Sequence, residues 1–262
     1  MIFEKPTDFT GCTLWLDAQD DDTFSHTQLS PEEKAIVDLW GTGEIKDNPY
    51  VFESWKDKGS FQITLRQESY MRPFIDPQGI NGKTAVRFDG SDFLELPDNL
   101  ITFEQFSVFV VGSSKNVDEG DGMGGTLLGS GCGNELGVQV RPDGTALFAL
   151  GRTTYKQADN FTHITPIDSS AHIFGFQALK GFAEFRLDGE SLAVGRCTMT
   201  NKLKNMAIGV YKQGRNLRPL VARYLIGHIG EVIFYNKCLN VKERLRVELY
   251  LKKRWGLKHM PE

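Results

Sequence analysis

The stretch from Gly227 to Leu257, GHIGEVIFYNKCLNVKERLRVELYLKKRWGL, predicts one strand followed by one helix. Its first part, Ile229 to Tyr235, is rich in β-branched and aromatic residues and contains the consecutive apolar residues of VIF. A strand that is apolar on both faces is normally covered on both faces. We therefore expect this segment to be a central strand of a sheet.

The second part predicts an amphipathic helix over about 241–255. Asn240 can cap its start, with Glu243 at the third helical position returning a hydrogen bond to the cap backbone. Gly256 can adopt the left-handed conformation that ends a helix. The expected buried face consists of Val241, Leu245, Leu249, Leu251 and Trp255, and the expected solvent face of Lys242, Arg246 and Lys253. Such a strand and helix indicate a helix docked on a β-structure.

At 262 residues the chain fits two small domains or one β-sandwich with long loops equally well. Because no stretch has the composition of an interdomain linker, we expect a single domain over residues 1–262. The chain has 27 Gly and 18 Phe, which suits many short strands joined by tight turns. Its formal net charge of −4 gives no basic field for nucleic acid or anionic lipid. No apolar run reaches the length needed to span a membrane, and the first residues lack the pattern of a secretory signal. We expect a protein that is not exported by a signal peptide.

The four cysteines, Cys12, Cys132, Cys197 and Cys238, are widely spaced and form no C-x-x-C pair. This spacing resembles neither a zinc site nor a disulfide scaffold, so we expect reduced thiols. Cys12 and Cys238 could meet if the first and last strands pair, but we favour free thiols there too.

Strand-like runs recur every eight to twelve residues with turn dipeptides between them, which predicts an all-β antiparallel sandwich or barrel. Thr84 to Leu96 predicts a hairpin turning at Asp89-Gly90. Gln105 to Ser113 is apolar on both faces and should be central. Further strands are expected at Thr126–Ser130, Glu135–Val140, Thr145–Leu150, His172–Leu179 and Phe182–Leu187. We expect an insertion at about 30–50, with a short helix starting at Ser30-Pro31.

Two acidic segments are candidates for calcium. Asp17 and the run Asp20 to Asp22 could bind the ion, although a solvated turn with Asp side chains bonded to nearby amides is favoured. The loop Asn116 to Gly125 carries the second set of candidates, Asp118, Glu119 and Asp121, without a regular ligand spacing. We expect no other cofactor.

The sequence contains only weak matches to patterns that are typical of catalytic sites. Glu184, Arg186 and Asp188 share a strand face, but Asp188-Gly189 predicts a turn and Arg186 should pair with its neighbours. A retaining glycosidase needs two carboxylates about 5 Å apart. The glycine-flanked Ser130 lies between strands rather than at a strand–turn–helix elbow. We expect no enzyme, and a glycoside hydrolase remains a remote alternative.

Binding by loops is the remaining possibility. We expect Gly151 to Ser170 to be a long polar loop and Gly214 to Pro219 to be a basic loop. Aromatic platforms and polar groups suit sugars or protein partners. The candidate binding residues on these loops are Arg152, Tyr155, Asn160, Phe161, His163, Arg215 and Arg218.

Landmark motifs occur in order along nearly the whole chain. They are LWLDA (14–18), WKDKG (55–59), NGKTAVRFDGSDFLEL (81–96), FSVFVVGS (106–113), LLGSG (127–131), FRLDG (185–189), IGEVIFYNKCL (229–239) and RWGL (254–257). The sequence thereby resembles the concanavalin A-like, laminin-G-like jelly-roll domains. This resemblance implies two packed antiparallel sheets and, more loosely, glycan or surface binding, without fixing a ligand.

Similar domains occur in phage particles, whose proteins are assembled in the host cytoplasm and need no export signal. The first functional hypothesis is therefore a non-catalytic bacteriophage virion protein, in capsid decoration or in the tail. Its partners would be other virion proteins and host-surface glycans. The alternative is a soluble carbohydrate-binding lectin module.

Overall fold

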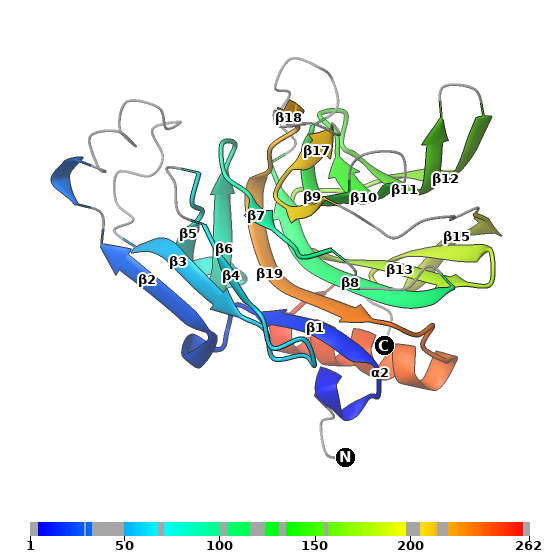
Figure 1. Ribbon diagram of the computed structural model, residues 1–262, viewed down its shortest axis with the longest axis horizontal. Helices are drawn as coiled ribbons and strands as arrows, with labels where there is room; N and C mark the ends of the chain where they lie inside the picture. Colours follow the sequence, from blue (N-terminus) through cyan, green and yellow to red (C-terminus); the bar gives the residue numbers. More distant parts are fainter. Residues whose placement is uncertain are drawn as a thin grey trace.

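The computed structural model shows two antiparallel β-sheets packed face to face, with one helix against the outer face of the larger sheet (Figure 1). The expectation of an all-β sandwich with a C-terminal helix is therefore confirmed. The structure describes residues 5–28, 30–32, 50–67, 71–98, 100, 104–115, 124–130, 135–154, 157–197, 205–213 and 220–258. Outside them lie most of the 30–50 insertion and Asp118, Glu119, Asp121, Cys132, Tyr155, Arg215 and Arg218.

The larger sheet runs in the order β15-β14-β13-β8-β19-β6-β5-β3-β2, with β1 beside β19 and β4 beside β3. β8 and β19 lie in its middle, as their apolar sequences predict. Its strands are β1 (Cys12–Asp17), β2 (Phe24–Gln28), β3 (Tyr50–Lys56), β4 (Thr64–Arg66), β5 (Phe74–Ile80), β6 (Lys83–Asp89), β8 (Gln105–Ser114), β13 (His172–Leu179), β14 (Phe182–Leu187), β15 (Glu190–Arg196) and β19 (Ile226–Tyr235).

The smaller sheet has the order β12-β11-β10-β9-β16-β7, and the separate hairpin β17-β18 lies beside it (Figure 1). Between the two sheets, the ring of Phe148 packs against Phe176 and Phe185, each with a centroid distance of 5.5 Å. The bounds are β7 (Leu94–Glu95), β9 (Gly125–Ser130), β10 (Glu135–Val140), β11 (Thr145–Thr154), β12 (Gln157–Pro166), β16 (Met206–Ile208), β17 (Tyr211–Gln213) and β18 (Leu220–Ala222). Two 3₁₀ turns, η1 (Pro6–Asp8) and η2 (Asp21–Thr23), flank β1.

The predicted hairpin over Thr84 to Leu96 is wrong. β6 pairs with β5 and β19 in the larger sheet, whereas β7 pairs with β16 in the smaller one. The buried Asp92 carboxylate accepts a hydrogen bond from the Asp89 backbone N–H at 3.1 Å, and Gly90 has a φ of 101°. The turn therefore carries the chain from one sheet to the other instead of reversing it.

The predicted loop over Gly151 to Ser170 is also wrong. β11 continues to Thr154, and β12 pairs with it over its full length from Gln157 to Pro166. The polar residues in this stretch reflect an edge strand, in which alternate side chains face solvent.

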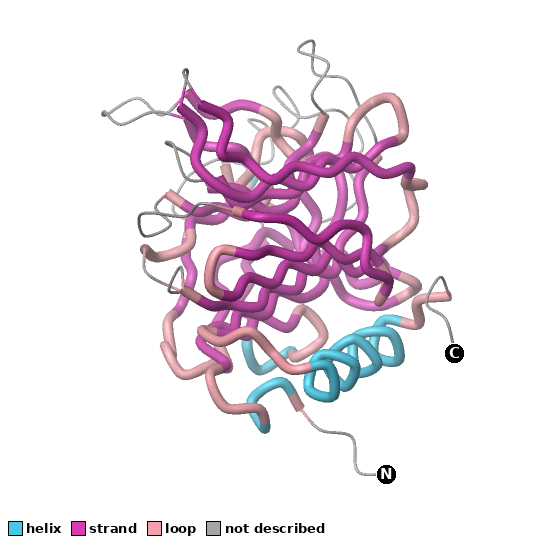
Figure 2. The backbone as a smooth tube through the Cα atoms, turned by 90° about the vertical axis from the view of Figure 1, so that its right-hand side faces the viewer, coloured by secondary structure: helices cyan, strands magenta, loops and turns pink. Residues whose placement is uncertain are grey.

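Helix α2 (Val241–Trp255) lies against the outer face of the larger sheet, below β1 and β19 (Figures 1 and 2). Its start and end are as predicted. The Asn240 side chain accepts from the Glu243 N–H at 3.0 Å, the Asn240 N–H donates to the Glu243 carboxylate at 3.1 Å, and Gly256 has a φ of 63°. Among the described residues, no helix is long and apolar enough to cross a bilayer.

The buried face of α2 is only partly as expected. Leu251 and Trp255 are buried, but Val241, Leu245 and Leu249 are 60%, 52% and 42% exposed. The helix is rotated about its axis relative to the expected orientation, because polar side chains bind it to the sheet. The buried Glu248 accepts from Arg186 of β14 at 2.7 Å, and Arg244 lies 3.4 Å from the Glu184 carboxylate. The expected solvent residues Lys242, Arg246 and Lys253 are exposed.

A fully buried carboxylate joins α2 to the sheet. The indole N–H groups of Trp15 in β1 and Trp255 in α2 each donate to Glu231 of β19 at 2.7 Å. A Cβ at Gly230 would lie 2.6 Å from the Trp255 ring, so glycine is required for this close packing. Burial, reinforced by the nearby Asp17 charge, raises the pKa of Glu231 to about 8.

The described cysteines, Cys12, Cys197 and Cys238, are free, as expected. Although β1 pairs with β19, Cys12 lies opposite Tyr235 rather than Cys238. Burial raises the pKa of the Cys12 thiol to about 12 and that of the Cys197 thiol to about 11. Neither of these two groups is activated as a thiolate.

Candidate functional site

The outer face of the smaller sheet carries a shallow depression. Pairing register places two rows of outward residues across β9, β10, β11 and β12. The first row is Thr126, Gln139, Leu147 and Ile164, and the second is Gly129, Gly137, Ala149 and Thr162. Because the side chains of the second row are small, the outer surface of the sheet is recessed along this row.

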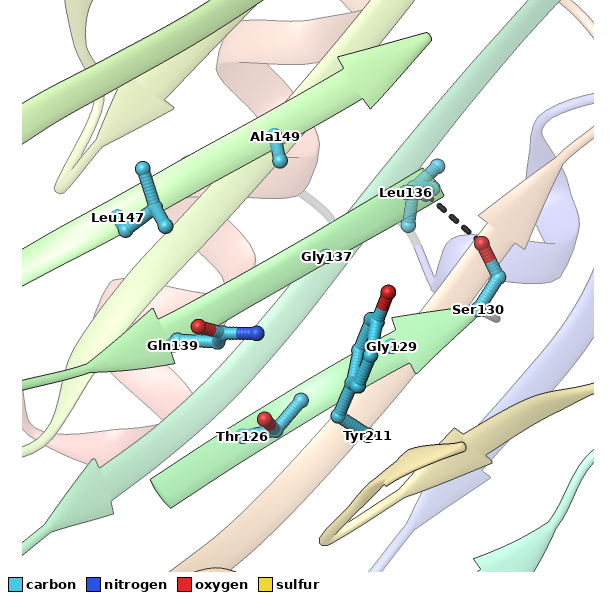
Figure 3. A pocket seen from close by; sticks show the side chains of 9 residues that line it. All are labelled: Thr126, Gly129, Ser130, Leu136, Gly137, Gln139, Leu147, Ala149 and Tyr211. Carbon is cyan, nitrogen blue, oxygen red and sulfur yellow. Dashed lines mark hydrogen bonds between the residues drawn. The ribbon is translucent and has the colours of Figure 1, made fainter. Parts of the chain in front are cut away.

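Tyr211 at the start of β17 forms the wall of the depression (Figure 3). A Cβ at Gly129 would lie 3.2 Å from the Val210 carbonyl oxygen and 3.0 Å from the Thr126 methyl carbon. Glycine at this position therefore lets the β17 backbone approach β9 closely. The enclosed volume is about 10 Å³, room for about one water molecule, although the empty space including open solvent above it is about 240 Å³. Its lining is Thr126, Gly129, Ser130, Leu136, Gly137, Gln139, Leu147, Ala149 and Tyr211.

Polar atoms are placed around this small-residue floor. The Ser130 hydroxyl accepts from the Leu136 backbone N–H at 2.8 Å, and Gln139 extends over the opposite side (Figure 3). Thr126 is fully buried, and no described group hydrogen-bonds to its hydroxyl. A buried hydroxyl is normally satisfied, so this one indicates a position for a ligand or water oxygen. An aromatic wall with few polar groups is a combination found at sugar sites. Because the enclosed space admits about one water molecule, a sugar ring would have to lie over the depression and against Tyr211.

Arg223, which follows β18, packs over the rim of the depression. Its guanidinium lies 5.0 Å from the centre of the Tyr211 ring, and its Nη1 donates to the Gln139 Oε1 at 3.5 Å. The Arg223 backbone has a φ of 62°, and its carbonyl accepts from the Thr126 N–H at 3.0 Å. Arg223 therefore connects Tyr211, Gln139 and β9.

Of the predicted binding residues, Tyr155, Arg215 and Arg218 lie outside the described residues, and the four described ones lie on strands. Phe161 stacks on Phe185 with a centroid distance of 4.5 Å, and His163 pairs with the inward-facing Phe148, so both belong to the interior side of the sheet. Arg152 and Asn160 lie on β11 and β12 rather than on a loop.

Sequence analysis missed the residues of the depression. A signal was present, because GTLLGS and ELGVQV place glycines on β9 and β10 as directly paired neighbours, Gly129 with Gly137. Glycine in a strand often marks a close approach by a ligand or another backbone. This pairing could not be recognised without the register between the two strands.

Glu184, one of the carboxylates considered for glycoside hydrolysis, is bound in an ion pair with Arg186. Arg186 donates to Glu184 and to Glu248, both at 2.7 Å, and also donates to the Gly189 carbonyl. The expectation that Arg186 pairs with its neighbours is confirmed. These contacts hold α2 against β14.

A serine, a histidine and two aspartates lie close together near the start of β13. His172 Nδ1 lies 2.6 Å from Asp188, while its Nε2 lies 3.1 Å from Asp168 and 3.4 Å from the Ser170 hydroxyl. Burial disfavours the imidazolium, but hydrogen bonds and charge from Asp188 and Asp168 outweigh it and raise the His172 pKa. A general base must be neutral to accept the serine proton. Asp168, the second aspartate, favours the charged imidazolium, so His172 is poorly suited to act as a base. We therefore assign these residues the structural role of stabilising the 168–172 turn.

The acidic turn after β1 is held by cations and backbone amides. Asp17 accepts from Arg254 at 2.6 Å and pairs with Lys58 at 3.3 Å, and Asp20 also pairs with Lys58. Their other oxygens accept the backbone N–H groups of Gln19 and Asp22. The expected bonds from Asp side chains to nearby amides are confirmed, but the turn is not solvated at Asp17, which is buried. In the described parts of the chain, no group of three or more His, Cys, Asp or Glu residues could hold a metal.

Solved structures of similar fold include binding domains and an enzyme. The botulinum neurotoxin type G receptor binding domain aligns with a TM-score of 0.55 at 9% identity, over 93% of this chain and 52% of its own. A botulinum neurotoxin DC binding domain in complex with SialylT gives 0.56 at 11% identity, over 92% and 52%. Trypanosoma rangeli sialidase gives 0.51 at 13% identity, over 95% and 33%.

These similarities establish the β-sandwich fold. The chain spans about half the length of the neurotoxin structures and a third of the sialidase. No family model and no curated protein matches the sequence.

Proposed function

We propose that this protein is a non-catalytic carbohydrate-binding sandwich that binds a sugar against Tyr211, over the depression on the outer face of the smaller sheet. The observation that carries the proposal is the combination of the Tyr211 wall, the Gly129 and Gly137 floor, and the buried Thr126 hydroxyl, to which no described residue hydrogen-bonds. Aromatic rings bind the C–H face of a sugar, while hydroxyl and amide groups bind its hydroxyls. The SialylT complex of a neurotoxin DC binding domain supports the compatibility of this fold with a bound sugar.

Replacing Tyr211 with alanine should weaken sugar binding roughly tenfold. At about 25 cal/mol per Å², an aromatic contact of about 60 Å² contributes about 1.5 kcal/mol. Replacing Ala149 with leucine should also weaken sugar binding, because the larger side chain would fill the recess formed by the second row of small residues. The measurement is a glycan array followed by calorimetric titration of the best ligand. Val194→Thr on β15 of the other sheet is the control and should bind like the wild type. Equal affinities for all four proteins would contradict the site.

A second candidate function is structural, as a component of a phage particle assembled in the host cytoplasm. The observation that favours it is the row of exposed apolar side chains on α2, Val241, Leu245 and Leu249, which are spaced four residues apart. Burying one leucine against another protein contributes about 1.5–3 kcal/mol. The partner in this proposal is a coat or tail protein of the particle.

The particle role predicts that Leu245→Asp reduces co-sedimentation with purified phage particles from the native source roughly tenfold or more. The matched control is Val194→Asp, since Val194 is an apolar side chain that is 66% exposed on β15. Retained sedimentation of the Leu245 variant, or equal loss in both variants, would contradict attachment through α2.

A further inference from the structure

The enclosed part of the depression is small and mostly apolar. Its volume of about 10 Å³ admits about one water molecule, and a methyl group is close to a water molecule in size. The recess runs along Gly129, Gly137 and Ala149, which are paired neighbours on β9, β10 and β11. Leu136 and Leu147 also line it. The floor therefore offers mainly carbon atoms to a group that enters it.

A sugar hydroxyl would find few hydrogen-bond partners on this floor. β9, β10 and β11 are interior strands of the smaller sheet, so their backbone N–H and C=O groups pair with neighbouring strands. The Ser130 hydroxyl already accepts from the Leu136 N–H at 2.8 Å. An enclosed oxygen needs several polar partners, whereas an apolar group needs none. The floor of the recess therefore favours a methyl group over a hydroxyl.

One side of the recess carries two hydrogen-bond donors, Thr126 and Gln139, which are paired on β9 and β10 and line the depression. Thr126 is fully buried, and no described residue hydrogen-bonds to its hydroxyl. Gln139 is 7% exposed, and its Oε1 accepts from Arg223 at 3.5 Å, which leaves its amide N–H groups as donors. Figure 3 shows this amide nitrogen directed toward Tyr211, with Thr126 below it. Because unpaired buried donors are costly, these two side chains indicate an acceptor oxygen beside the recess.

A methyl group with an acceptor oxygen beside it is the arrangement found in an acetyl group. In an acetamido sugar, the methyl and the carbonyl oxygen share one carbon atom, and the amide nitrogen joins that carbon to the ring. The methyl can enter the recess while the ring stays above the depression. A plain hexose has no methyl group, and a 6-deoxy sugar has a methyl group without an adjoining carbonyl.

We infer that the depression selects sugars with an N-acetyl group, such as N-acetylglucosamine or N-acetylgalactosamine. The acetyl methyl lies among Gly129, Gly137 and Ala149, and the acetyl oxygen accepts hydrogen bonds from Thr126 and Gln139. This inference rests on the proposed sugar binding and adds the class of sugar.

The test is a calorimetric titration with methyl glycosides of N-acetylglucosamine and N-acetylgalactosamine, each compared with its parent hexose and its N-formyl and N-propionyl analogues. At least one N-acetyl sugar should bind roughly tenfold or more tightly than its parent hexose. The N-formyl analogue lacks the methyl group and should bind roughly fourfold more weakly. The N-propionyl analogue should also bind more weakly, because its extra carbon exceeds the recess. Methyl fucoside, a 6-deoxy sugar, should bind like the hexoses.

Two variants test the two halves of the site. Ala149→Gly enlarges the recess by one methyl group, so the N-propionyl sugar should bind this variant more tightly than the N-acetyl sugar does. Ala193→Gly on β15 is its matched control and should keep the wild-type order. Thr126→Val keeps the branched shape without the donor and should reduce the preference for the N-acetyl sugar over its parent hexose. Thr27→Val on β2 should keep the preference.

The outcomes separate the inference from the proposal beneath it. Equal binding of N-acetyl and parent sugars by the wild type overturns the N-acetyl class and leaves sugar binding standing. Binding of no sugar overturns both. Tighter binding of the N-propionyl sugar or the fucoside by the wild type overturns the recess as an acetyl site, as does an unchanged preference in both Ala149→Gly and Thr126→Val. If a variant does not fold, the analogue series on the wild type decides the matter.

Discussion

Replacing Trp255 with alanine is expected to lower the free energy of unfolding by about 3–5 kcal/mol. The indole is fully buried between α2 and β19, where it lies against Gly230 and donates to Glu231 at 2.7 Å. Alanine would leave a cavity under the helix and remove one donor to a buried carboxylate. A loss of this size is a large share of the stability of an ordinary domain.

The measurement is urea unfolding followed by tryptophan fluorescence and circular dichroism. Leu249→Ala provides a control on the same helix, because Leu249 is 42% exposed. Surface substitutions of this kind usually change stability by less than about 0.5 kcal/mol. If the Trp255 variant unfolds at the same urea concentration as the control, α2 does not depend on this contact.

The second large effect is expected for Glu231→Ala. This change leaves two buried indole N–H groups, those of Trp15 and Trp255, without an acceptor. Each unsatisfied buried donor costs about 1–3 kcal/mol, so the expected loss is about 2–6 kcal/mol. Glu231→Gln retains the size and one carbonyl oxygen, and it should lose less. An alanine variant as stable as the glutamine variant would contradict this role of the carboxylate.

The pH dependence of stability tests the state of the same carboxylate. Burial first, and then the Asp17 charge, raise the pKa of Glu231 in the folded protein from 4.5 to about 8. A raised folded pKa means that the stability from this group is fully present below pH 4.5 and is lost as the pH rises toward about 8. The stability of the wild type minus that of Glu231→Gln should therefore fall across this range. A difference that is constant or rises with pH would contradict the raised pKa.

Local signals in the sequence predicted the elements that depend on local chemistry. The apolar runs of β8 and β19 gave their central positions, and Asn240, Glu243 and Gly256 gave the ends of α2. These signals work because caps, turns and two-sided apolar strands act within a few residues.

Elements that depend on tertiary contacts could not be predicted in this way. The orientation of α2 is set by Glu248 and Arg244 binding partners on β13 and β14, so three apolar residues of the helix face outward. The exposed edge strand β12 has the polar composition of a loop. The passage of the chain from β6 in the larger sheet to β7 in the smaller sheet depends on two buried carboxylates, Asp89 and Asp92. The sequence pattern alone does not identify these residues as buried.

The candidate site could not be predicted for a similar reason. It is assembled from β9, β10, β11 and β17, whose register brings Gly129, Gly137, Gln139 and Tyr211 together. Phe161, one of the two aromatic residues selected from the sequence, instead stacks inside the sandwich on Phe185, while the other, Tyr155, lies outside the described residues. Residue type indicated sugar chemistry, but only strand pairing shows which side of the sheet each residue faces.

The most direct test of the central claim is an amide NMR titration of the wild-type protein with the tightest-binding sugar from the glycan array. Binding in the depression predicts saturable shifts of the amides of Thr126, Gly129, Gly137, Gln139 and Tyr211, with little change at residues of α2. Shifts confined to the 168–172 turn, to α2 or to the larger sheet would contradict the assignment of the depression as the sugar site.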